Sequence, residues 1–171
     1  EFNRVEIGET LASDPNLLKN KKVEVNLATL SNDPKKQNIK ITFLFSKLEE
    51  DGIYTDLVKY ELISAYTKRL VKRERIKLED SFIAETKDNI KVRLKPFVVT
   101  RNLAQRAVIK RLRREIKDNL LKEVKKLDYP ELFMDTISHN LQNSLKDSIK
   151  KIYPISYSEI RILEKLWNSK M

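Results

Sequence analysis

The 171-residue chain contains no cysteine, two glycines and one histidine. Without cysteine there can be no disulfide, thiolate metal site or cysteine nucleophile. His139 alone cannot build a histidine metal cluster or a Ser-His-Asp triad, so we expect it to be structural or solvated. Gly8 and Gly52 form no glycine-rich phosphate loop. The longest apolar runs, such as Ile41 to Phe45, are far too short to span a membrane. These absences predict a protein that is not an enzyme.

Positive charge is abundant, with 35 Lys and Arg against 25 Asp and Glu and a formal net charge of +10. Such an excess favours a partner that is nucleic acid or an anionic membrane surface. The cations gather in three clusters, which we predict to bind RNA: Lys35 and Lys36; Lys68, Arg69, Lys72, Arg73, Arg75 and Lys77; and Arg101, Arg106, Lys110, Arg113, Arg114 and Lys117. Three clusters in a small chain favour polyanion binding over an ordinary solvated surface.

The third cluster lies in the segment 101–126, which has the period of an amphipathic helix. Five of its cations share one side of that helix: Arg106, Lys110, Arg113, Arg114 and Lys117. The apolar residues fall largely on the other side: Ala104, Val108, Ile109, Leu112, Ile116 and Leu120. Such a helix packs on the core through one face and presents cations to a partner through the other.

Alternating patterns before this segment predict strands, and periodic patterns after it predict helices. The expected elements are strands at 23–30, 39–48 and 53–60, a short helix at 63–73, strands at 76–86 and 90–100, a helix at 130–152 after the basic one, and a return strand at 158–166. Gly52 supplies a hairpin turn, Asn89 a turn that tolerates the left-handed conformation, and Pro96 an edge or a bulge.

This order predicts an α+β fold, with an antiparallel sheet curled into a partial β-barrel and flanked by two long helices near the C-terminus and one short helix. We expect one domain over residues 1–171. It comprises an extended segment at 1–22, mainly strands at 23–100, helices at 101–152 and the return strand at 158–166. The chain begins Glu1-Phe2-Asn3 without an initiator methionine, so we expect further residues to precede it.

Two further functions also fit the sequence. The carboxylates of Glu49-Glu50-Asp51 and Glu79-Asp80 are the ligand type that Mg²⁺ prefers, so a metal-dependent nuclease is one alternative, although both groups are typical of solvated surface. The other is a free protein that binds nucleic acid or an anionic surface. The strand aromatics have spacings typical of a core rather than of a base-stacking platform, which favours recognition of folded RNA by shape and phosphates.

An ordered series of motifs resembles the archaeal and eukaryotic small-subunit ribosomal protein family eS-one (older name S-three-a), most closely in its archaeal form. The motifs span nearly the whole chain: Ile7-Gly8-Glu9-Thr10-Leu11-Ala12-Ser13-Asp14-Pro15, Lys36-Gln37-Asn38, Glu61-Leu62, Tyr66, Leu70-Val71-Lys72-Arg73, Thr86-Lys87-Asp88, Val92-Arg93-Leu94-Lys95-Pro96, Ile109-Lys110-Arg111-Leu112-Arg113-Arg114, Ile152-Tyr153-Pro154 and Ile160-Arg161. Each motif is weak alone, but the ordered set is specific.

The resemblance implies a structural constituent of the small ribosomal subunit that supports translation, cytoplasmic and without catalysis, cofactor, membrane or small-molecule substrate. It implies binding to small-subunit rRNA on the platform near the mRNA exit, beside neighbouring ribosomal proteins, with mRNA as a further candidate partner. The RNA contacts that it implies lie at Lys36, Lys72, Arg73, Lys95, Lys110, Arg113 and Arg114. The sequence departs from the family pattern at Glu74, which dilutes a basic run, at Asn89 in place of glycine, and at Ser156-Tyr157.

Overall fold

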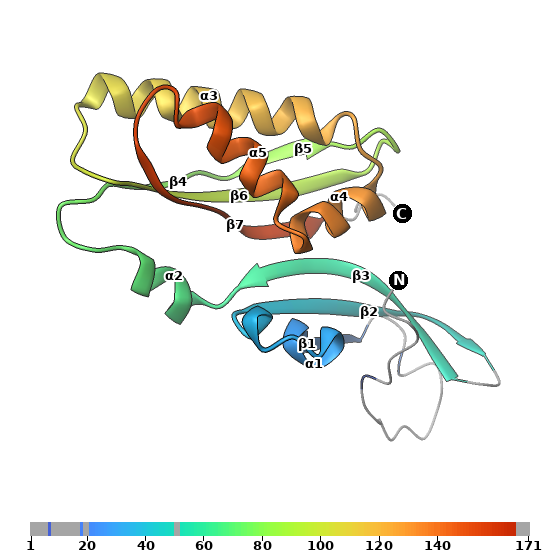
Figure 1. Cartoon of the computed structure of the whole chain (residues 1–171). Helices are drawn as coiled ribbons and strands as arrows, with labels where there is room; N and C mark the ends of the chain where they lie inside the picture. Colours follow the sequence, from blue (N-terminus) through green and yellow to red (C-terminus); the bar gives the residue numbers. More distant parts are fainter. Residues whose placement is uncertain (1–6, 8–17, 19–20, 50–51, 167–171) are drawn as a thin grey trace. The chain divides into compact units, whose positions relative to one another are not determined.

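The computed structural model describes residues 7, 18, 21–49 and 52–166, of which the side chains at 47–49, 52 and 53 are not described. The chain forms two compact units, Glu1–Ile63 and Ser64–Met171, whose helices and strands are shown in Figure 1. Most of the expected 1–22 segment and the tip of the turn at 50–51 lie outside the described residues.

The first unit is an antiparallel meander in which β2 lies between β1 and β3. Its described elements are β1 (Lys22–Asn26), α1 (Leu27–Ser31), the 3-10 helix η2 (Pro34–Lys36), β2 (Ile39–Glu49) and β3 (Gly52–Leu62). The strand expected at 23–30 ends early, at Asn26. The side-chain oxygen of Asn26 accepts a hydrogen bond from the Ala28 N–H at 2.9 Å, which caps a helical turn and takes the chain out of the strand.

The second unit is an antiparallel sheet with a layer of helices. Its elements are α2 (Ser64–Leu70), β4 (Lys77–Glu79), β5 (Phe82–Glu85), β6 (Lys91–Thr100), α3 (Arg106–Val124), α4 (Tyr129–Ile137), α5 (Asn140–Ile149) and β7 (Ile155–Lys165). β6 is central: it pairs with β7 along one side and with β5 and then β4 along the other. In Figure 1, α3 and α5 lie across one side of these strands and α2 lies on the opposite side.

Pro96 explains an irregularity of this sheet. The register of β6 with β7 shifts between Lys95 and Pro96, which confirms the expected bulge. On the other side of β6, β4 pairs only as far as Glu79 and β5 begins only at Phe82. Proline has no N–H to donate, so a neighbouring strand gains little by pairing with it. The single strand expected at 76–86 was therefore wrong, and two short strands stand in its place.

The helix expected at 130–152 was also wrong as a single element, because it breaks at His139. This residue has a left-handed backbone, with φ at 61°, between α4 and α5. The Gln142 side-chain nitrogen donates to the Thr136 carbonyl at 2.9 Å and satisfies one of the carbonyls that the end of α4 leaves open. His139 Nδ1 lies 3.5 Å from Glu159 Oε2 of β7, so it occupies a structural position. No glycine or proline marks this break in the sequence.

The predicted α+β class is confirmed: all the strand pairings within each unit are antiparallel, and α3 to α5 follow the block of strands. In neither unit do the described strands close into a barrel. The described helices include none with the length and apolarity needed to cross a membrane. The core of the second unit includes Val92, Leu94, Leu112, Phe133 and Leu163, all fully buried.

Candidate nucleic-acid interface

Helix α3 lies in a strongly basic segment of the chain. Segment 101–126 contains ten Lys and Arg and three Asp and Glu, a surplus of seven out of the chain's ten. The helix begins at Arg106 rather than at 101, because Gln105 still has an extended backbone. Leu112, Ile116, Leu120 and Val124 recur every four residues and are buried, which fixes the opposite face toward solvent.

That packing determines which cations of α3 are exposed. The exposed ones are Arg106, Lys110, Arg111, Arg113, Arg114, Lys117 and Lys122. The five predicted from the helical period are all in this set, but they occupy one flank of the exposed face rather than its middle. Arg111 and Lys122 were missed, although the helical period carries both of them to the exposed side.

Arg113 and Arg114 differ although they are neighbours in sequence. Arg113 Nη1 donates to Asp80 Oδ1 at 2.9 Å, which ties it to the break between β4 and β5. The side chain of Arg114 is 87% exposed, and its Nε lies 3.8 Å from Asp118 one turn further along the helix. Such an exposed pair is weak and exchanges readily with a phosphate. Arg114 is therefore the better placed of the two to reach a partner.

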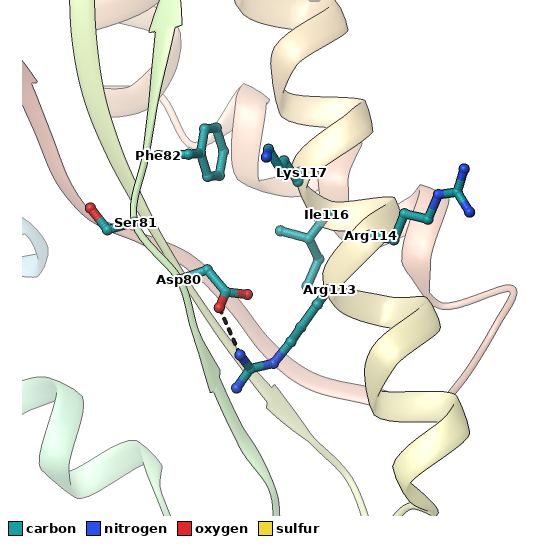
Figure 2. A pocket seen from close by; sticks show the side chains of 7 residues that line it. All are labelled: Asp80, Ser81, Phe82, Arg113, Arg114, Ile116 and Lys117. Atoms are coloured by element: carbon teal, nitrogen blue, oxygen red, sulfur yellow. Dashed lines mark hydrogen bonds and ion pairs between the residues drawn. The ribbon is translucent and has the colours of Figure 1, made fainter.

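A pocket lies between α3 and the β4–β5 break (Figure 2). Its volume is about 410 Å³. The residues that line it are Asp80, Ser81, Phe82, Arg113, Arg114, Ile116 and Lys117. Figure 2 shows the Phe82 ring directed toward α3, while the Ser81 hydroxyl points to the other side of the strand. The pocket thus combines an apolar floor with a cationic rim.

The second cluster, from Lys68 to Lys77, is divided by the structure. Lys68, Arg69, Lys72 and Arg73 are exposed on α2 and just after it, and the Arg69 guanidinium lies 5.9 Å from the centre of the Tyr66 ring. After Glu74, whose φ of 63° marks a left-handed turn, Arg75 donates to Ser156 Oγ at 2.9 Å and Lys77 pairs with Glu79 at 2.9 Å. The last two cations therefore have roles within the fold.

This cluster and the α3 face do not form one surface. Leu70 of α2 packs on Phe97 and Val99 of β6. Figure 1 places α2 and α3 on opposite sides of the strands. Of the remaining predicted residues, Arg101 is exposed before α3, and Lys95 is half-buried beside the β6 bulge. Lys35 and Lys36 lie in η2 of the first unit, where the Asp33 side chain accepts from the Lys35 N–H at 3.0 Å.

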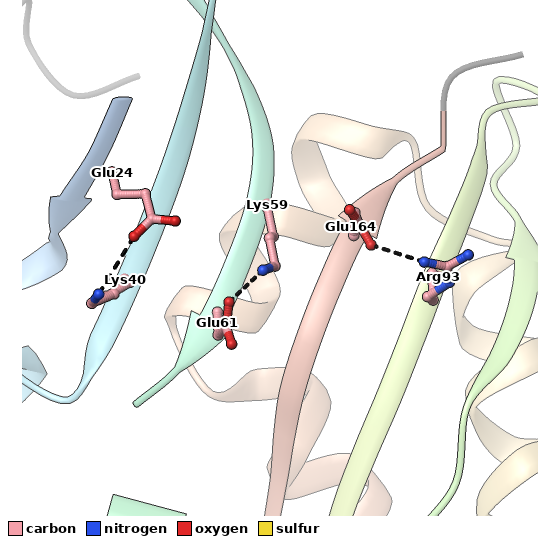
Figure 3. A network of polar contacts seen from close by, with 6 residues as sticks. All are labelled: Glu24, Lys40, Lys59, Glu61, Arg93 and Glu164. Carbon is pink, nitrogen blue, oxygen red and sulfur yellow. Dashed lines mark hydrogen bonds and ion pairs between the residues drawn. The ribbon is translucent and has the colours of Figure 1, made fainter. Parts of the chain in front are cut away.

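Several cations outside these clusters are paired with carboxylates. In the first unit, Lys40 contacts Glu24 at 3.4 Å across β1 and β2, and Lys59 contacts Glu61 within β3. In the second unit, Arg93 contacts Glu164 at 3.3 Å across β6 and β7. Figure 3 shows these three pairs. These contacts neutralise part of the positive charge that lies outside the predicted clusters.

Two of the carboxylates considered for a nuclease, Glu79 and Asp80, have cationic partners. Glu79 contacts Lys77 and Arg161, and Asp80 contacts Arg113. Burial raises the pKa of Glu79, but hydrogen bonds from Lys77 and Arg161 outweigh it and hold the pKa below its usual value. Across the described part of the chain, no three His, Cys, Asp or Glu side chains gather as a metal site would require. Glu49 lies at the edge of the undescribed turn.

The family model and the individual relatives that resemble this chain agree with one another. The sequence model of the Ribosomal S3Ae family matches residues 1–168. The chain belongs to this family. It is 33% identical to the small ribosomal subunit protein eS1 of Halorubrum lacusprofundi, over 95% of the chain and 76% of that protein. It is 32% identical to the eS1 protein of Nanoarchaeum equitans, over 94% of the chain and 81% of that protein, and 31% identical to that of Methanobrevibacter smithii, over 93% and 82%.

The family named from the sequence motifs is thereby confirmed. Membership supports a ribosomal, structural role rather than an enzymatic one.

Proposed function

We propose that this chain is a structural constituent of the small ribosomal subunit that binds folded rRNA through the exposed cations of α3. The observation that carries the proposal is the surplus of seven positive charges in segment 101–126, seven of whose ten cations are exposed on α3, a helix whose other face is fixed by the core. Arginine guanidinium groups suit paired contacts with phosphate oxygens. Family membership supports a ribosomal RNA as the polyanion.

The exposed residues Lys68, Arg69, Lys72 and Arg73 form a second contact region in this proposal. Because α2 and α3 lie on opposite sides of the sheet, the two regions bind separate segments of rRNA. Lys35, Lys36, Lys95 and Arg101 complete the proposed set of phosphate contacts. Arg75, Lys77 and Arg113 support the fold through their partners and make weaker contributions.

The position in the subunit is part of the same proposal. It is the platform near the mRNA exit, with other ribosomal proteins as neighbours, mRNA as a further partner and the cytoplasm as the compartment. Chemical cross-linking of native subunits, followed by identification of the linked RNA segments and proteins, tests it. Cross-links to the body of the subunit far from the platform would contradict this location.

The test of RNA binding compares two variants with the same reduction in charge. The first replaces Arg106, Lys110, Arg114 and Lys117 of α3 by Gln. The control replaces Lys21, Lys22, Lys91 and Lys151 by Gln, which are exposed and lie outside the proposed contacts. Removing one cation that neutralises a phosphate reduces the slope of log K against log salt by about 1. We expect a reduction of about 3–4 for the α3 variant and less than about 1 for the control.

Equal slopes for the two variants would show that binding follows net charge alone and would favour the non-ribosomal polyanion binder. Sedimentation of a native lysate completes the test. The protein should migrate with the small subunit at moderate and at high salt. A position at the top of the gradient would contradict the ribosomal role.

A further inference from the structure

The pocket beside Arg113 has a composition that phosphate binding does not require. Its floor is the Phe82 ring and the buried Ile116, and its rim carries Arg113, Arg114 and Lys117 (Figure 2). Phosphates need cations and N–H donors, whereas an aromatic floor suits the flat face of a nucleobase. An apolar recess beside a strongly cationic helix therefore fits a ligand that has both parts.

The strand geometry explains why the recess is there. β4 ends at Glu79 and β5 begins at Phe82, opposite the bulge at Pro96 of β6. This break turns Asp80 out of the sheet ladder, and α3 spans the site through the ion pair between Asp80 and Arg113. Phe82 is only partly covered by the helix. The break in the strands thus leaves the apolar floor of the pocket accessible, because no packed side chain covers it completely.

The size of the recess limits the ligand. Small-molecule sites have volumes of about 300–1,000 Å³, and this pocket of about 410 Å³ is near the lower limit. It accommodates one base and its sugar but not a stack of paired bases. A base enters such a site only from an unpaired position, where it can leave the helical stack.

Asp80 adds a preference among bases. One of its oxygens, Oδ1, is held by Arg113 at 2.9 Å, which fixes the orientation of the carboxylate at the pocket. A carboxylate accepts hydrogen bonds from base amino groups, which guanine, adenine and cytosine carry and uracil lacks. Figure 2 shows Lys117 on the pocket side of α3, where it can contact a phosphate beside the inserted nucleotide, whereas the Arg114 guanidinium extends away from Asp80 and Phe82.

We infer that this pocket takes the base of a single unpaired nucleotide of the bound RNA, with a base that carries an amino group preferred over uracil. The base lies on Phe82, Asp80 accepts from its amino group, and Lys117 contacts a neighbouring phosphate. The inference rests on the proposed RNA binding and names the structural feature of the RNA that this site recognises.

The experiment uses three RNA hairpins of identical stem sequence: one fully paired, one with a single bulged guanosine and one with a single bulged uridine. Binding of the whole chain is measured by fluorescence anisotropy at about 50 mM salt, where phosphate contacts are strong. Stacking of one base on an aromatic side chain corresponds to about 5–100-fold in affinity. We expect the guanosine bulge to bind tighter than the paired stem by that factor, with the uridine bulge between them.

Two variants of adjacent residues on β5 assign the effect. Phe82→Leu keeps the apolar volume but removes the aromatic face, and it should reduce the preference for the bulge to less than about twofold. Ile83→Leu is the control, because Ile83 is 56% exposed and does not line the pocket. Circular dichroism and thermal melting confirm that both variants are folded. A third variant, Asp80→Asn, should abolish most of the discrimination between guanosine and uridine.

Each outcome has a separate meaning. Equal affinity for the three hairpins overturns the inference and leaves the proposed RNA binding intact. A bulge preference that survives Phe82→Leu also overturns it, because the base is then bound elsewhere. Failure to bind any hairpin at low salt contradicts the proposed function itself, since phosphate contacts do not depend on sequence.

Discussion

Arg113 of α3 and Asp80, 33 residues earlier in the chain, form a hydrogen-bonded ion pair of 2.9 Å that joins the basic helix to the break between β4 and β5. This contact removes one cation from the exposed face of α3 and fixes one carboxylate at the adjacent pocket. Arg113 therefore contributes to the fold, whereas the other exposed cations of α3 can contact RNA.

A double-mutant cycle on Asp80→Asn and Arg113→Gln measures this contact. The side chains are 31% and 49% exposed, so water screens the attraction. We expect a coupling free energy of about 0.2–1 kcal/mol from urea unfolding at low salt. A coupling above about 2 kcal/mol would contradict the assignment of an ordinary surface pair.

Leu112→Ala and Leu103→Ala compare a buried and an exposed leucine of the basic segment. Leu112 is 0% exposed and Leu103 is 66% exposed. Because truncation at Leu112 leaves a cavity between α3 and the core, we expect it to lower the free energy of unfolding by about 2–5 kcal/mol. Leu103→Ala should change it by less than about 0.5 kcal/mol. Chemical denaturation checks both, and similar destabilisation at the two positions would mean that the helix phase is wrong.

Asn89 has a φ of 59°, in the turn between β5 and β6. Glycine adopts this conformation without steric cost, whereas a β-branched residue does not. We expect Asn89→Gly to be neutral or slightly stabilising and Asn89→Val to lower the free energy of unfolding by about 1–2 kcal/mol. Lys91→Val, at an exposed strand position, is the control and should have little effect. If the two valine variants are destabilised equally, the left-handed turn is not the cause.

Glu79 gives the protein a pH-dependent contribution to stability. Burial raises its pKa, but the hydrogen bonds from Lys77 and Arg161 lower it by more than burial raises it. The folded-state pKa therefore lies below the usual value of 4.5. A lowered pKa stabilises the fold above the unfolded-state pKa, and this stabilisation is lost as the pH falls through the folded-state pKa.

We therefore expect Glu79→Gln to reduce the free energy of unfolding at pH 7, with a difference from the wild type that shrinks as the pH falls below about 4.5. Urea unfolding at a series of pH values is the measurement. Glu85→Gln, at an exposed position of β5, is the matched control and should show no such trend. A difference that stays constant from pH 7 to pH 3 would contradict the role of the Glu79 charge.

Local patterns were sufficient for several parts of the fold. Alternation located β2, β3, β6 and β7, and the helical period located the buried side of α3 through Leu112, Ile116 and Leu120. The left-handed turn at Asn89 and the bulge at Pro96 were also predicted, because each depends on the intrinsic geometry of one residue. Five of the exposed cations of α3 were predicted because the helical period places them away from the buried side, along one flank of the exposed face.

Other features depend on contacts that are distant in sequence. The break at His139 has no glycine or proline to mark it, and the imidazole of His139 lies beside Glu159 of β7, 20 residues further along the chain. The sequence groups Arg75 with the exposed basic cluster, yet its side chain reaches Ser156, 81 residues away. Neither contact leaves a periodic trace, so no local pattern could predict it.

The sequence by itself determined the family, the α+β class and the cationic face of α3, because these follow from ordered motifs, from side-chain period and from composition. Only the tertiary structure decided which of those cations can reach a partner. Arg113 is held by Asp80, while Arg114 extends into solvent, although the two are adjacent in the sequence. The physical reason is that an ion pair depends on what the fold brings to within a few ångströms, and sequence spacing does not encode that distance.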